Sequence, residues 1–342
     1  MFLYTKITKI TKIMVGLVVL SFSLLLPLST GMAHASGGAW HLYTYSNAFQ
    51  GSRNYYVYTP ANYQPGTSVP MIVMLHGCTQ TPQDFAAGTQ MNQLADQHQF
   101  IVVYPQEQYI NNASLCWNWF LSVNQYRNSG EAGIIGGITQ AVEQDTSDWR
   151  IDTHHVYLAG MSAGAAMASN MGATYPDLYA AIGIHSGLEY QATTNAYGAA
   201  YAQLYGGPNP TSQGDAAYNT MGSYAHVVPV IVFHGTADTV VNPINGNQAV
   251  QQWMRTDYDA SGGSYNASFS SPSSTTNGQV SGGHSYTIRR WNNSSGQEIE
   301  EYWTINGMGH AWSGGSSSGS YTDPAGPSAT QAMYTFFMSH SR

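Results

Sequence analysis

Short runs of consecutive apolar residues recur along the chain, and each run is bounded by polar residues, glycine or proline. A run of four or five such residues is typical of a strand that is buried on both faces, as in a parallel sheet. We therefore expect a row of buried parallel strands. The runs are residues 71–75, 100–104, 156–159, 180–184 and 230–233.

Segments with helical spacing alternate with these runs. Thr81 and Pro82 resemble an N-cap followed by proline at the first helical position, which predicts a helix from there towards Gln97. Ser328 is a candidate N-cap for a closing helix. This alternation predicts an α/β fold with a mainly parallel, doubly wound sheet and helices on both faces. The remaining helices are expected at 131–145, 163–174, 244–253 and 328–338.

Some segments depart from this alternation. Residues 53–59 alternate aromatic and polar side chains before a proline and predict an early antiparallel strand, whereas 299–305 predict a late strand. Residues 189–225 are rich in Tyr, Ala, Gly and Asn, and we interpret them as an insertion over the sheet. Residues 259–283 are rich in Ser, Gly, Asn and Thr and predict an irregular surface excursion.

The N-terminal residues have the pattern of a secretory signal peptide. Lysines precede an apolar stretch over 13–28, and Ala33-His34-Ala35 then offers a cleavage site between small residues. A transmembrane anchor is the alternative, but the apolar stretch is shorter than the roughly 20 residues that a span needs. We therefore expect a signal peptide over 1–35 and a single secreted, extracellular domain over 36–342.

Composition bears on the class of partner. The chain has a net charge of −8, and all of its lysines lie in the predicted signal peptide, which leaves seven arginines against 18 acidic residues, a balance of −11. Nucleic-acid binding relies on clustered cations, so no nucleic-acid partner is expected, and no membrane partner after cleavage. A surface with so few carboxylates gains little repulsive charge in acid, which suggests an acidic or otherwise harsh extracellular niche.

The chain contains two cysteines, Cys78 and Cys116. In an exported protein two thiols more often pair than stay free. A bridge would close a loop of about 40 residues and contribute on the order of 3–4 kcal/mol to stability. Two unrelated buried thiols are the alternative.

Residues 160–164 read Gly-Met-Ser-Ala-Gly, a pattern that places a serine at a sharp turn between a strand and a helix. A serine hydroxyl is a weak nucleophile, so it needs exposure, a neighbouring base and donors for the oxyanion. An apolar strand precedes Ser162 and a helix of small residues follows it. This context predicts Ser162 as a nucleophile, although three fixed positions also match by chance.

The acid and the base should follow the serine in that order, each after a later strand. Asp238 lies in the turn after the buried run 230–233, where open α/β sheets bind ligands. Glu189 and Asp257 are alternatives, but neither directly follows a convincing strand. His310 lies in a glycine-rich loop after the last predicted strand and is the expected base, whereas His76 and His234 are expected to shape turns.

An oxyanion hole needs two backbone N–H groups aimed at one point. Ala163, directly after the nucleophile, and Cys78, in the loop after the run 71–75, are the expected donors. Thr79 of the same loop and Trp119 are candidate substrate-binding residues. Trp119 and its neighbour Trp117 could form an apolar wall, with Trp119 the exposed one, or both could pack in the core.

These motifs together resemble the poly(3-hydroxybutyrate) depolymerase-like esterase family, which also contains feruloyl and acetylxylan esterases. The resemblance runs from about Arg53 to the C-terminal helix. It implies an α/β-hydrolase fold, a triad of Ser162, Asp238 and His310, a disulfide bond and ester hydrolysis outside the cell. The matching segments are Leu75-His76-Gly77-Cys78-Thr79-Gln80, Cys116-Trp117-Asn118-Trp119-Phe120, Gly160-Met161-Ser162-Ala163-Gly164, His234-Gly235-Thr236-Ala237-Asp238 and Gly307-Met308-Gly309-His310-Ala311-Trp312.

The expected function is hydrolysis of a short-chain polyhydroxyalkanoate polyester or its oligomers, with no cofactor and no metal. A feruloyl or acetylxylan esterase acting on plant polysaccharide is the alternative. A non-catalytic secreted carbohydrate-binding protein on the same fold is an alternative of another class. Polymer-degrading members often add a linker and a C-terminal polymer-binding domain, which we do not expect in this chain, so firm attachment to solid polymer is in question.

Overall fold

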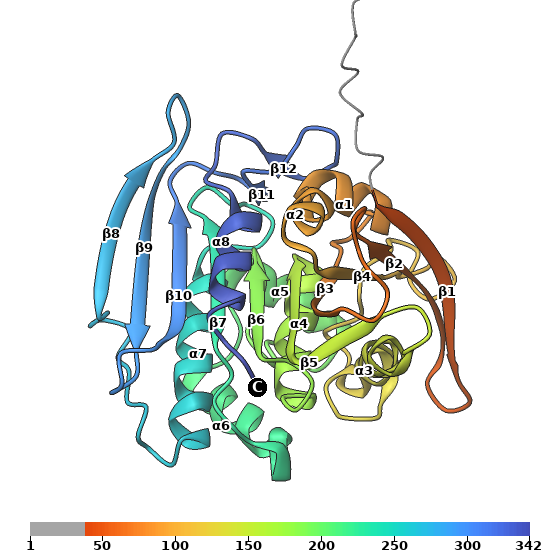
Figure 1. The fold of residues 1–342 in the computed structure, drawn as a ribbon. Helices are drawn as coiled ribbons and strands as arrows, with labels where there is room; N and C mark the ends of the chain where they lie inside the picture. The colour runs from red at the N-terminus through yellow and green to blue at the C-terminus, as the bar shows by residue number, and fades with distance from the viewer. Residues whose placement is uncertain (1–37) are drawn as a thin grey trace, which may run out of the picture. The chain divides into compact units, whose positions relative to one another are not determined.

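One ten-stranded sheet organises residues 38–342, the part of the chain that the computed structural model describes (Figure 1). The predicted signal peptide, residues 1–35, lies outside the described residues. In sheet order the strands are β1 (Ala39–Asn47), β2 (Gly51–Thr59), β4 (Ile101–Pro105), β3 (Ser68–Leu75), β5 (Arg150–Met161), β6 (Ala181–His185), β7 (Val230–Gly235), β10 (Glu298–Ile305), β9 (Ser285–Asn292) and β8 (Ser274–Gln279). The strands from β4 to β10 in this order are parallel, and antiparallel strands flank them on both sides.

Helices cover both faces of this sheet. The apolar side chains of α3, α4 and α7 belong to one core cluster, and those of α1, α2 and α8 belong to a second cluster on the opposite face. The helices are α1 (Pro82–Thr89), α2 (Met91–His98), α3 (Gly130–Gln144), α4 (Ala163–Thr174), α5 (Ala196–Tyr205), α6 (Pro210–Met221), α7 (Ile244–Ala260) and α8 (Ala329–Phe337), with short 3₁₀ turns η1 (Ser122–Asn124) and η2 (Gly222–Tyr224) and a two-residue pair, β11 (Trp312–Ser313) and β12 (Thr322–Asp323).

The run of apolar residues in β3 shows why these strands lack an alternating pattern. Successive side chains of a strand point to opposite faces of the sheet. Met71 and Val73 pack in the cluster with α3 and α4, whereas Ile72 and Met74 pack in the cluster with α1, α2 and α8. Because both faces are covered, every position must be apolar. The predicted mainly parallel, doubly wound sheet is confirmed.

The helix predicted from Thr81 towards Gln97 is instead two helices. The Thr81 hydroxyl does accept a hydrogen bond from the Asp84 amide, as a cap should. However, Gln90 adopts a left-handed conformation with φ of 59°, and its N–H donates to the Ala86 carbonyl at 2.9 Å. This geometry ends α1, and α2 begins at the next residue. Gly88, two residues before the break, is the local sequence signal that the prediction of one continuous helix overlooked.

The antiparallel edge beside β10 also differs from expectation. Helix α7 continues to Ala260, beyond the predicted end at residue 253. The segment 259–283, expected to be irregular, contains β8 near its end, and β9 follows it without having been predicted. Five of the six β8 residues are exposed, so this edge strand has no apolar face and carries no alternating signal. The edge strand β1 was also not predicted, although its half-buried Tyr43 and Tyr45 alternate with exposed residues and pack against the core.

The predicted insertion, residues 189–225, forms α5, α6 and η2. Helix α6 packs against α4 and α7, and α5 packs against α7, so the segment adds a layer outside one face of the sheet. None of the helices in residues 38–342 is long and apolar enough to cross a bilayer.

Glu189 begins this segment, and its side chain is buried. Neither carboxylate oxygen has a hydrogen-bond partner among the described residues. The carboxylate lies against Gly207, where an added Cβ would come within 2.5 Å of Glu189 Oε1. Burial without a partner favours the neutral acid and raises the pKa of Glu189 to about 9.

We predict that Glu189→Gln stabilises the protein at pH 8 but not at pH 4. The unfolded carboxyl titrates near 4.5 and the folded one at about 9. The contribution of neutral Glu189 to the free energy of unfolding is fully present below the pKa of the unfolded chain and is lost as pH rises through the pKa of the folded chain. Glutamine does not ionise, so the variant does not lose this contribution. Thermal unfolding followed by circular dichroism at both pH values measures the effect. Equal shifts of the unfolding midpoint at the two values would contradict it.

Candidate active site

Ser162 lies at the sharp turn between the end of β5 and the start of α4. Its backbone has φ of 56° and ψ of −121°, a strained conformation for a residue with a side chain. The flanking glycines allow this turn because a Cβ at Gly160 would lie 2.3 Å from the Gly164 carbonyl oxygen. A Cβ at Gly164 would lie 2.1 Å from the carbonyl oxygen of Leu75. The local packing thus requires the pattern that the sequence displays.

Asp238 and His310 form a hydrogen-bonded pair beside this serine. Asp238 lies in the turn after β7, and His310 lies in the loop after β10, the next strand of the sheet. The Nδ1 atom of His310 is 2.7 Å from Asp238 Oδ2, so the ring donates from Nδ1 and its Nε2 remains to act as a base. His310 and Ser162 line the same cavity. The structure therefore brings the three predicted residues together.

The other oxygen of Asp238 fixes the orientation of the carboxylate. Asp238 Oδ1 accepts hydrogen bonds from the amides of Val240 and Val241, both at 2.9 Å. Burial alone would raise the pKa of Asp238, but the hydrogen bond and the charge of His310 hold it below its ordinary value. Asp238 therefore stays ionised and can stabilise a protonated His310.

Two further histidines hold the loops that carry these groups. His234 Nε2 donates to the Val241 carbonyl at 2.8 Å, which braces the turn of Asp238. His76 Nδ1 donates to the Gly77 carbonyl at 2.8 Å, and its Nε2 accepts from the Glu107 amide at 3.0 Å. Burial lowers the pKa of both imidazoles, to about 4 for His76, so both are neutral structural groups at pH 7.

The loop after β3 leaves one amide for an oxyanion. The Gly77 amide donates to Gln80 Oε1 at 2.9 Å, and the Thr79 amide donates to the Ser114 carbonyl at 2.7 Å. The Gln80 amide donates to the Gly77 carbonyl at 3.4 Å. Cys78 also lines the cavity with Ser162. Unlike the amides of Gly77, Thr79 and Gln80, its amide donates no hydrogen bond within the described residues. The amide of Ala163, at the first position of α4, has no partner inside its helix.

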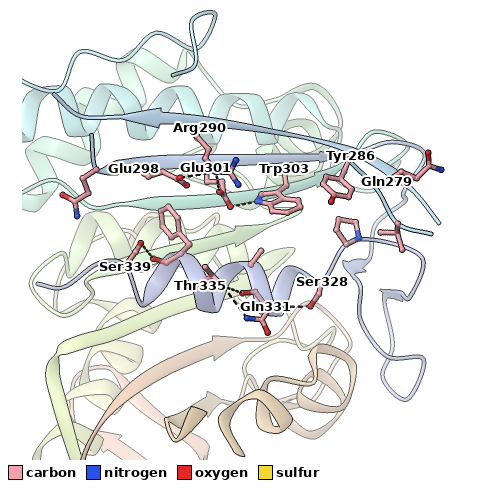
Figure 2. A pocket seen from close by; sticks show the side chains of 15 residues that line it. Gln279, Tyr286, Arg290, Glu298, Glu301, Trp303, Ser328, Gln331, Thr335 and Ser339 are labelled. Carbon is pink, nitrogen blue, oxygen red and sulfur yellow. Dashed lines mark hydrogen bonds and ion pairs between the residues drawn. The ribbon is translucent and has the colours of Figure 1, made fainter. Parts of the chain in front are cut away.

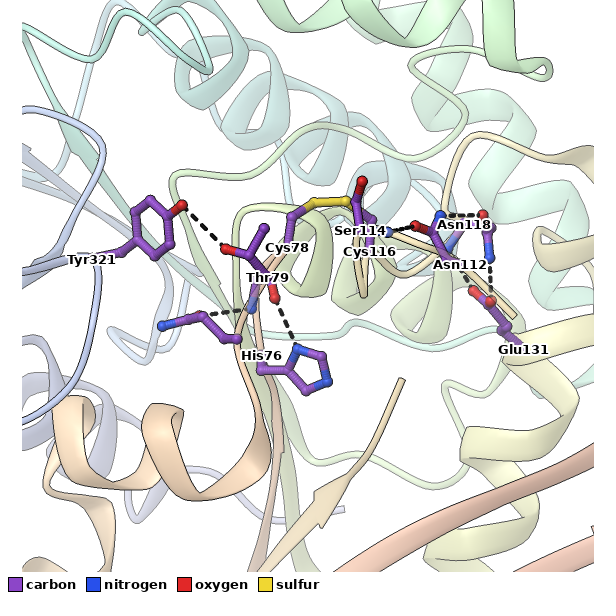
Figure 3. The surroundings of a disulfide bond; sticks show 11 residues. His76, Cys78, Thr79, Asn112, Ser114, Cys116, Asn118, Glu131 and Tyr321 are labelled. Atoms are coloured by element: carbon purple, nitrogen blue, oxygen red, sulfur yellow. Dashed lines mark hydrogen bonds between the residues drawn. A yellow bond between two sulfur atoms is a disulfide. The ribbon is translucent and has the colours of Figure 1, made fainter. Parts of the chain in front are cut away.

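A disulfide between Cys78 and Cys116 anchors this loop, with Cα atoms 4.1 Å apart (Figure 3). The segment that carries Cys116 is itself fixed to α3. The amide and the side chain of Asn118 donate to the carboxylate of Glu131 at 2.7 and 2.6 Å. The bridge therefore joins the expected oxyanion donor to a core helix.

The cavity beside Ser162 has a volume of about 150 Å³. Three of its residues come from places that sequence reasoning did not connect to the site. Gln203 comes from α5, Val240 from the turn after Asp238, and Tyr321 from the loop before β12. Tyr321 also contacts the edge of the His310 ring and shares a hydrogen bond with the Thr79 hydroxyl at 3.1 Å. Of these three residues, only Val240 could have been connected to the site from the sequence, because it lies two residues after the predicted acid Asp238.

The remaining candidates lie away from this cavity. Trp119 is 3% exposed and Trp117 is fully buried, so the expectation of an exposed Trp119 is wrong and both rings pack in the core. Thr79 is exposed and contacts Tyr321, but it does not line the cavity. The alternative acids Glu189 and Asp257 are buried, and neither lines the cavity; Asp257 accepts from the Val228 amide at 2.8 Å.

A larger groove of about 840 Å³ lies between β9, β10 and α8 (Figure 2). Its wall includes Tyr286, Trp303 and Glu301, and the Trp303 indole donates to Glu301 at 2.5 Å. None of the three predicted triad residues lines it. Size alone would therefore select a groove away from the predicted triad, whereas Ser162 and His310 line the smaller cavity.

The chain is similar to known proteins over most of its length. A family model described as "Esterase PHB depolymerase" matches residues 52–268. Poly(3-hydroxyalkanoate) depolymerase C of Paucimonas lemoignei is 34% identical over 71% of this chain and 55% of its own length. Acetylxylan esterase A of Talaromyces purpureogenus is 31% identical over 64% of this chain and 56% of its own length. The chain thus spans about half the length of these relatives.

Among solved structures, an acetyl xylan esterase from Aspergillus awamori superposes with a TM-score of 0.68. The match covers 88% of this chain and all of that one, at 20% sequence identity. At this identity the likeness concerns the fold alone, and it agrees with the predicted α/β-hydrolase architecture.

We predict that Cys116→Ser both destabilises the protein and slows its reaction with soluble esters. Loss of the bridge should lower the free energy of unfolding by about 3–4 kcal/mol, and it frees the loop that carries the Cys78 amide. Urea unfolding and turnover of p-nitrophenyl acetate measure the two effects. Reduction of the wild-type protein should reproduce both. A destabilised variant with wild-type kcat would show that the bridge does not position the donor.

Proposed function

Because the chain belongs to the PHB depolymerase esterase family, we propose that it is a serine hydrolase of carboxylic esters. The observation that carries this proposal is the hydrogen bond between Asp238 Oδ2 and Nδ1 of His310, the histidine that lines one cavity together with Ser162. A nucleophile, a base that takes its proton and an acid that orients the base are the parts that acyl transfer needs.

In the proposed mechanism, His310 Nε2 takes the proton of the Ser162 hydroxyl as the oxygen attacks the ester carbonyl. Asp238 holds the ring in the required tautomer and stabilises its positive charge. The alcohol leaves with the proton from His310, and an acyl-enzyme remains. Water activated by His310 then releases the acid and restores the serine.

The Cys78 and Ala163 amides are the proposed donors to the oxyanion of both tetrahedral intermediates. Rigid donors stabilise developing charge because they need no reorganisation during the reaction. The disulfide and the Gln80–Gly77 hydrogen bond support the rigidity of one donor, and the start of α4 supports that of the other. Loss of one such donor typically costs about 3–4 kcal/mol of transition-state stabilisation.

The proposed substrate is a short-chain polyhydroxyalkanoate polyester or its oligomers. A cavity of about 150 Å³ suits an acyl unit of a few carbon atoms better than a bulky aryl acid. This favours hydroxyalkanoate or acetyl esters over feruloyl esters, and a named relative is a poly(3-hydroxyalkanoate) depolymerase. Acetylxylan is the second candidate because its acyl group is also small and a second relative is an acetylxylan esterase. A polymeric substrate would be met outside the cell, so we also propose secretion by the N-terminal signal.

We predict that Ser162→Ala abolishes both ester turnover and covalent labelling by a fluorophosphonate probe. Asp238→Asn should leave Ser162 in place as the residue that the probe labels, but it should lower kcat by on the order of 10⁴-fold. Asparagine no longer holds the His310 ring in the tautomer that carries its proton on Nδ1. Steady-state assays with p-nitrophenyl butyrate and gel detection of the probe measure these effects. Wild-type turnover by Ser162→Ala would refute the mechanism, and an unlabelled, inactive wild-type protein would favour a non-catalytic binding protein.

The substrate classes are separated by parallel assays of the purified protein. We predict release of 3-hydroxybutyrate oligomers from amorphous polyhydroxybutyrate at a higher rate than acetate from acetylated xylan or ferulate from methyl ferulate. Product release is followed by liquid chromatography, with Ser162→Ala as the blank. Faster release of acetate than of hydroxybutyrate would assign the protein to polysaccharide esters instead.

A further inference from the structure

Three charged side chains are buried together near the segment that carries Cys116. Arg53 lies in β2, Glu107 follows β4 and Glu131 lies in the first turn of α3, and they are 6%, 1% and 4% exposed. Arg53 Nε is 3.2 Å from Glu107 Oε2, and Arg53 Nη2 is 3.3 Å from Glu131 Oε1. We call these three residues the buried charge cluster. Because one arginine faces two carboxyl groups, the cluster is neutral only when one of them keeps its proton.

The hydrogen bonds indicate which carboxyl group keeps the proton. Glu131 accepts from the amide and the side chain of Asn118 and from Arg53. Glu107 has fewer donors among the described residues, namely Arg53 and the Gln108 amide at 3.0 Å. Burial, the charge of Glu131 and a hydrogen bond between the two carboxyl groups raise the pKa of Glu107 to about 8. At pH 7 Glu107 is therefore the neutral acid and Glu131 the anion.

A series of hydrogen bonds connects Glu131 to the loop after β3 (Figure 3). Asn118, which donates to Glu131, accepts through its Oδ1 from Asn112 Nδ2 at 2.8 Å. Asn112 Oδ1 accepts from the Ser114 amide at 2.8 Å, and the Ser114 carbonyl accepts from the Thr79 amide at 2.7 Å. This series reaches the residue after the proposed oxyanion donor and runs beside the disulfide bond.

Glu107 reaches the same loop from its other side. Its amide donates to His76 Nε2 at 3.0 Å, and His76 Nδ1 donates to the Gly77 carbonyl. The titratable and charged groups that face Glu107 are thus Arg53 from β2, Glu131 from α3 and His76 from the end of β3, and His76 is neutral at pH 7. The cluster therefore contacts supports on both sides of the loop.

We propose that Glu107 and Glu131 are positioning residues for the proposed oxyanion hole, which hold the Cys78 amide in place as long as their cluster retains one proton. Loss of that proton leaves two buried anions on one arginine, and their repulsion pushes apart the two segments that support the loop. This inference rests on the proposed function, because the position of the Cys78 amide affects turnover only if Ser162 attacks an ester.

The first test is Glu131→Gln, which keeps the size of the side chain but replaces one acceptor oxygen by an NH₂ group. This group cannot accept from Asn118, so one of the two bonds is lost and the segment of Cys116 shifts. We expect kcat for p-nitrophenyl butyrate, per active site titrated with the fluorophosphonate probe, to fall by at least about tenfold. KM should change by less than about twofold, because an oxyanion donor acts mainly in the transition state.

A matched control comes from a second group of the same composition. Arg290, Glu298 and Glu301 also combine one arginine with two carboxyl groups, and none of them lines the smaller cavity. Glu301 is 6% exposed and accepts from Arg290 Nε at 2.6 Å and from the Trp303 indole at 2.5 Å. Glu301→Gln should lower the thermal midpoint, as Glu131→Gln does, but leave kcat unchanged. Equal losses of kcat in the two variants, or wild-type kcat in Glu131→Gln, would overturn the proposal.

The second test is the pH profile of Glu107→Gln, whose neutral amide replaces the protonated acid and cannot ionise. In the wild type we expect kcat at pH 9 to be about a tenth of its value at pH 7, because only about a tenth of Glu107 keeps its proton one unit above a pKa of about 8. The variant should keep its pH 7 activity at pH 9. Ser162→Ala serves as the blank for spontaneous hydrolysis. An alkaline decline that persists unchanged in Glu107→Gln would overturn the role of this residue.

The rigidity of the loop is also measured without turnover. Hydrogen–deuterium exchange of residues 76–81 should be faster in Glu131→Gln than in the wild type and unchanged in Glu301→Gln. Unchanged exchange in Glu131→Gln would overturn the proposal. A wild-type protein that hydrolyses no ester would refute the proposed function, whereas faster exchange in Glu131→Gln would still support the role of the cluster. If Glu131→Gln does not fold, the pH profiles of Glu107→Gln and the wild type decide.

Discussion

The site depends on how closely the start of α4 approaches the end of β3. Gly164 lies against the Leu75 carbonyl, and Gly160 lies against Gly164, so neither position has room for a Cβ. This contact forces the turn at Ser162 and brings the first amide of α4 beside the loop that follows β3. Because β3 and β5 are neighbours in the sheet, the nucleophile and both proposed oxyanion donors are positioned by one packing constraint.

The same constraint explains how much of the site could be predicted. The glycine pattern, the Asp238 turn and the His310 loop are local features directly after buried strands, and such strands have a strong sequence signal. Gln203 and Tyr321 reach the cavity only through long connections, so nothing near them in sequence refers to the site. Exposure of Trp119 depended on tertiary packing, and the pattern around it fits a buried or an exposed ring equally well. The exposed strand β8 lacks apolar periodicity, so that part of the fold could not be predicted either.

Several buried carboxyl groups influence how the protein responds to pH. Burial raises the pKa of Glu107 to about 8 and of Glu189 to about 9, and it also raises the pKa of Asp257 and Glu300. For each group the unfolded chain releases its proton at a lower pH than the folded chain. Their combined effect is stability that is greatest in acid and declines as pH rises towards 8 or 9. This direction agrees with the acidic niche suggested by the sparse surface charge, but it has a separate cause, the burial of these carboxyl groups.

The connections around the cavity join its walls to its catalytic groups. Tyr321 contacts His310 and pairs with Thr79, next to the proposed donor Cys78, so the proposed base and the proposed oxyanion loop share a support. On the opposite wall, the Gln203 carbonyl binds Asn242, only a few residues after Asp238. The orientation of α5 is therefore set by the turn that also holds the acid.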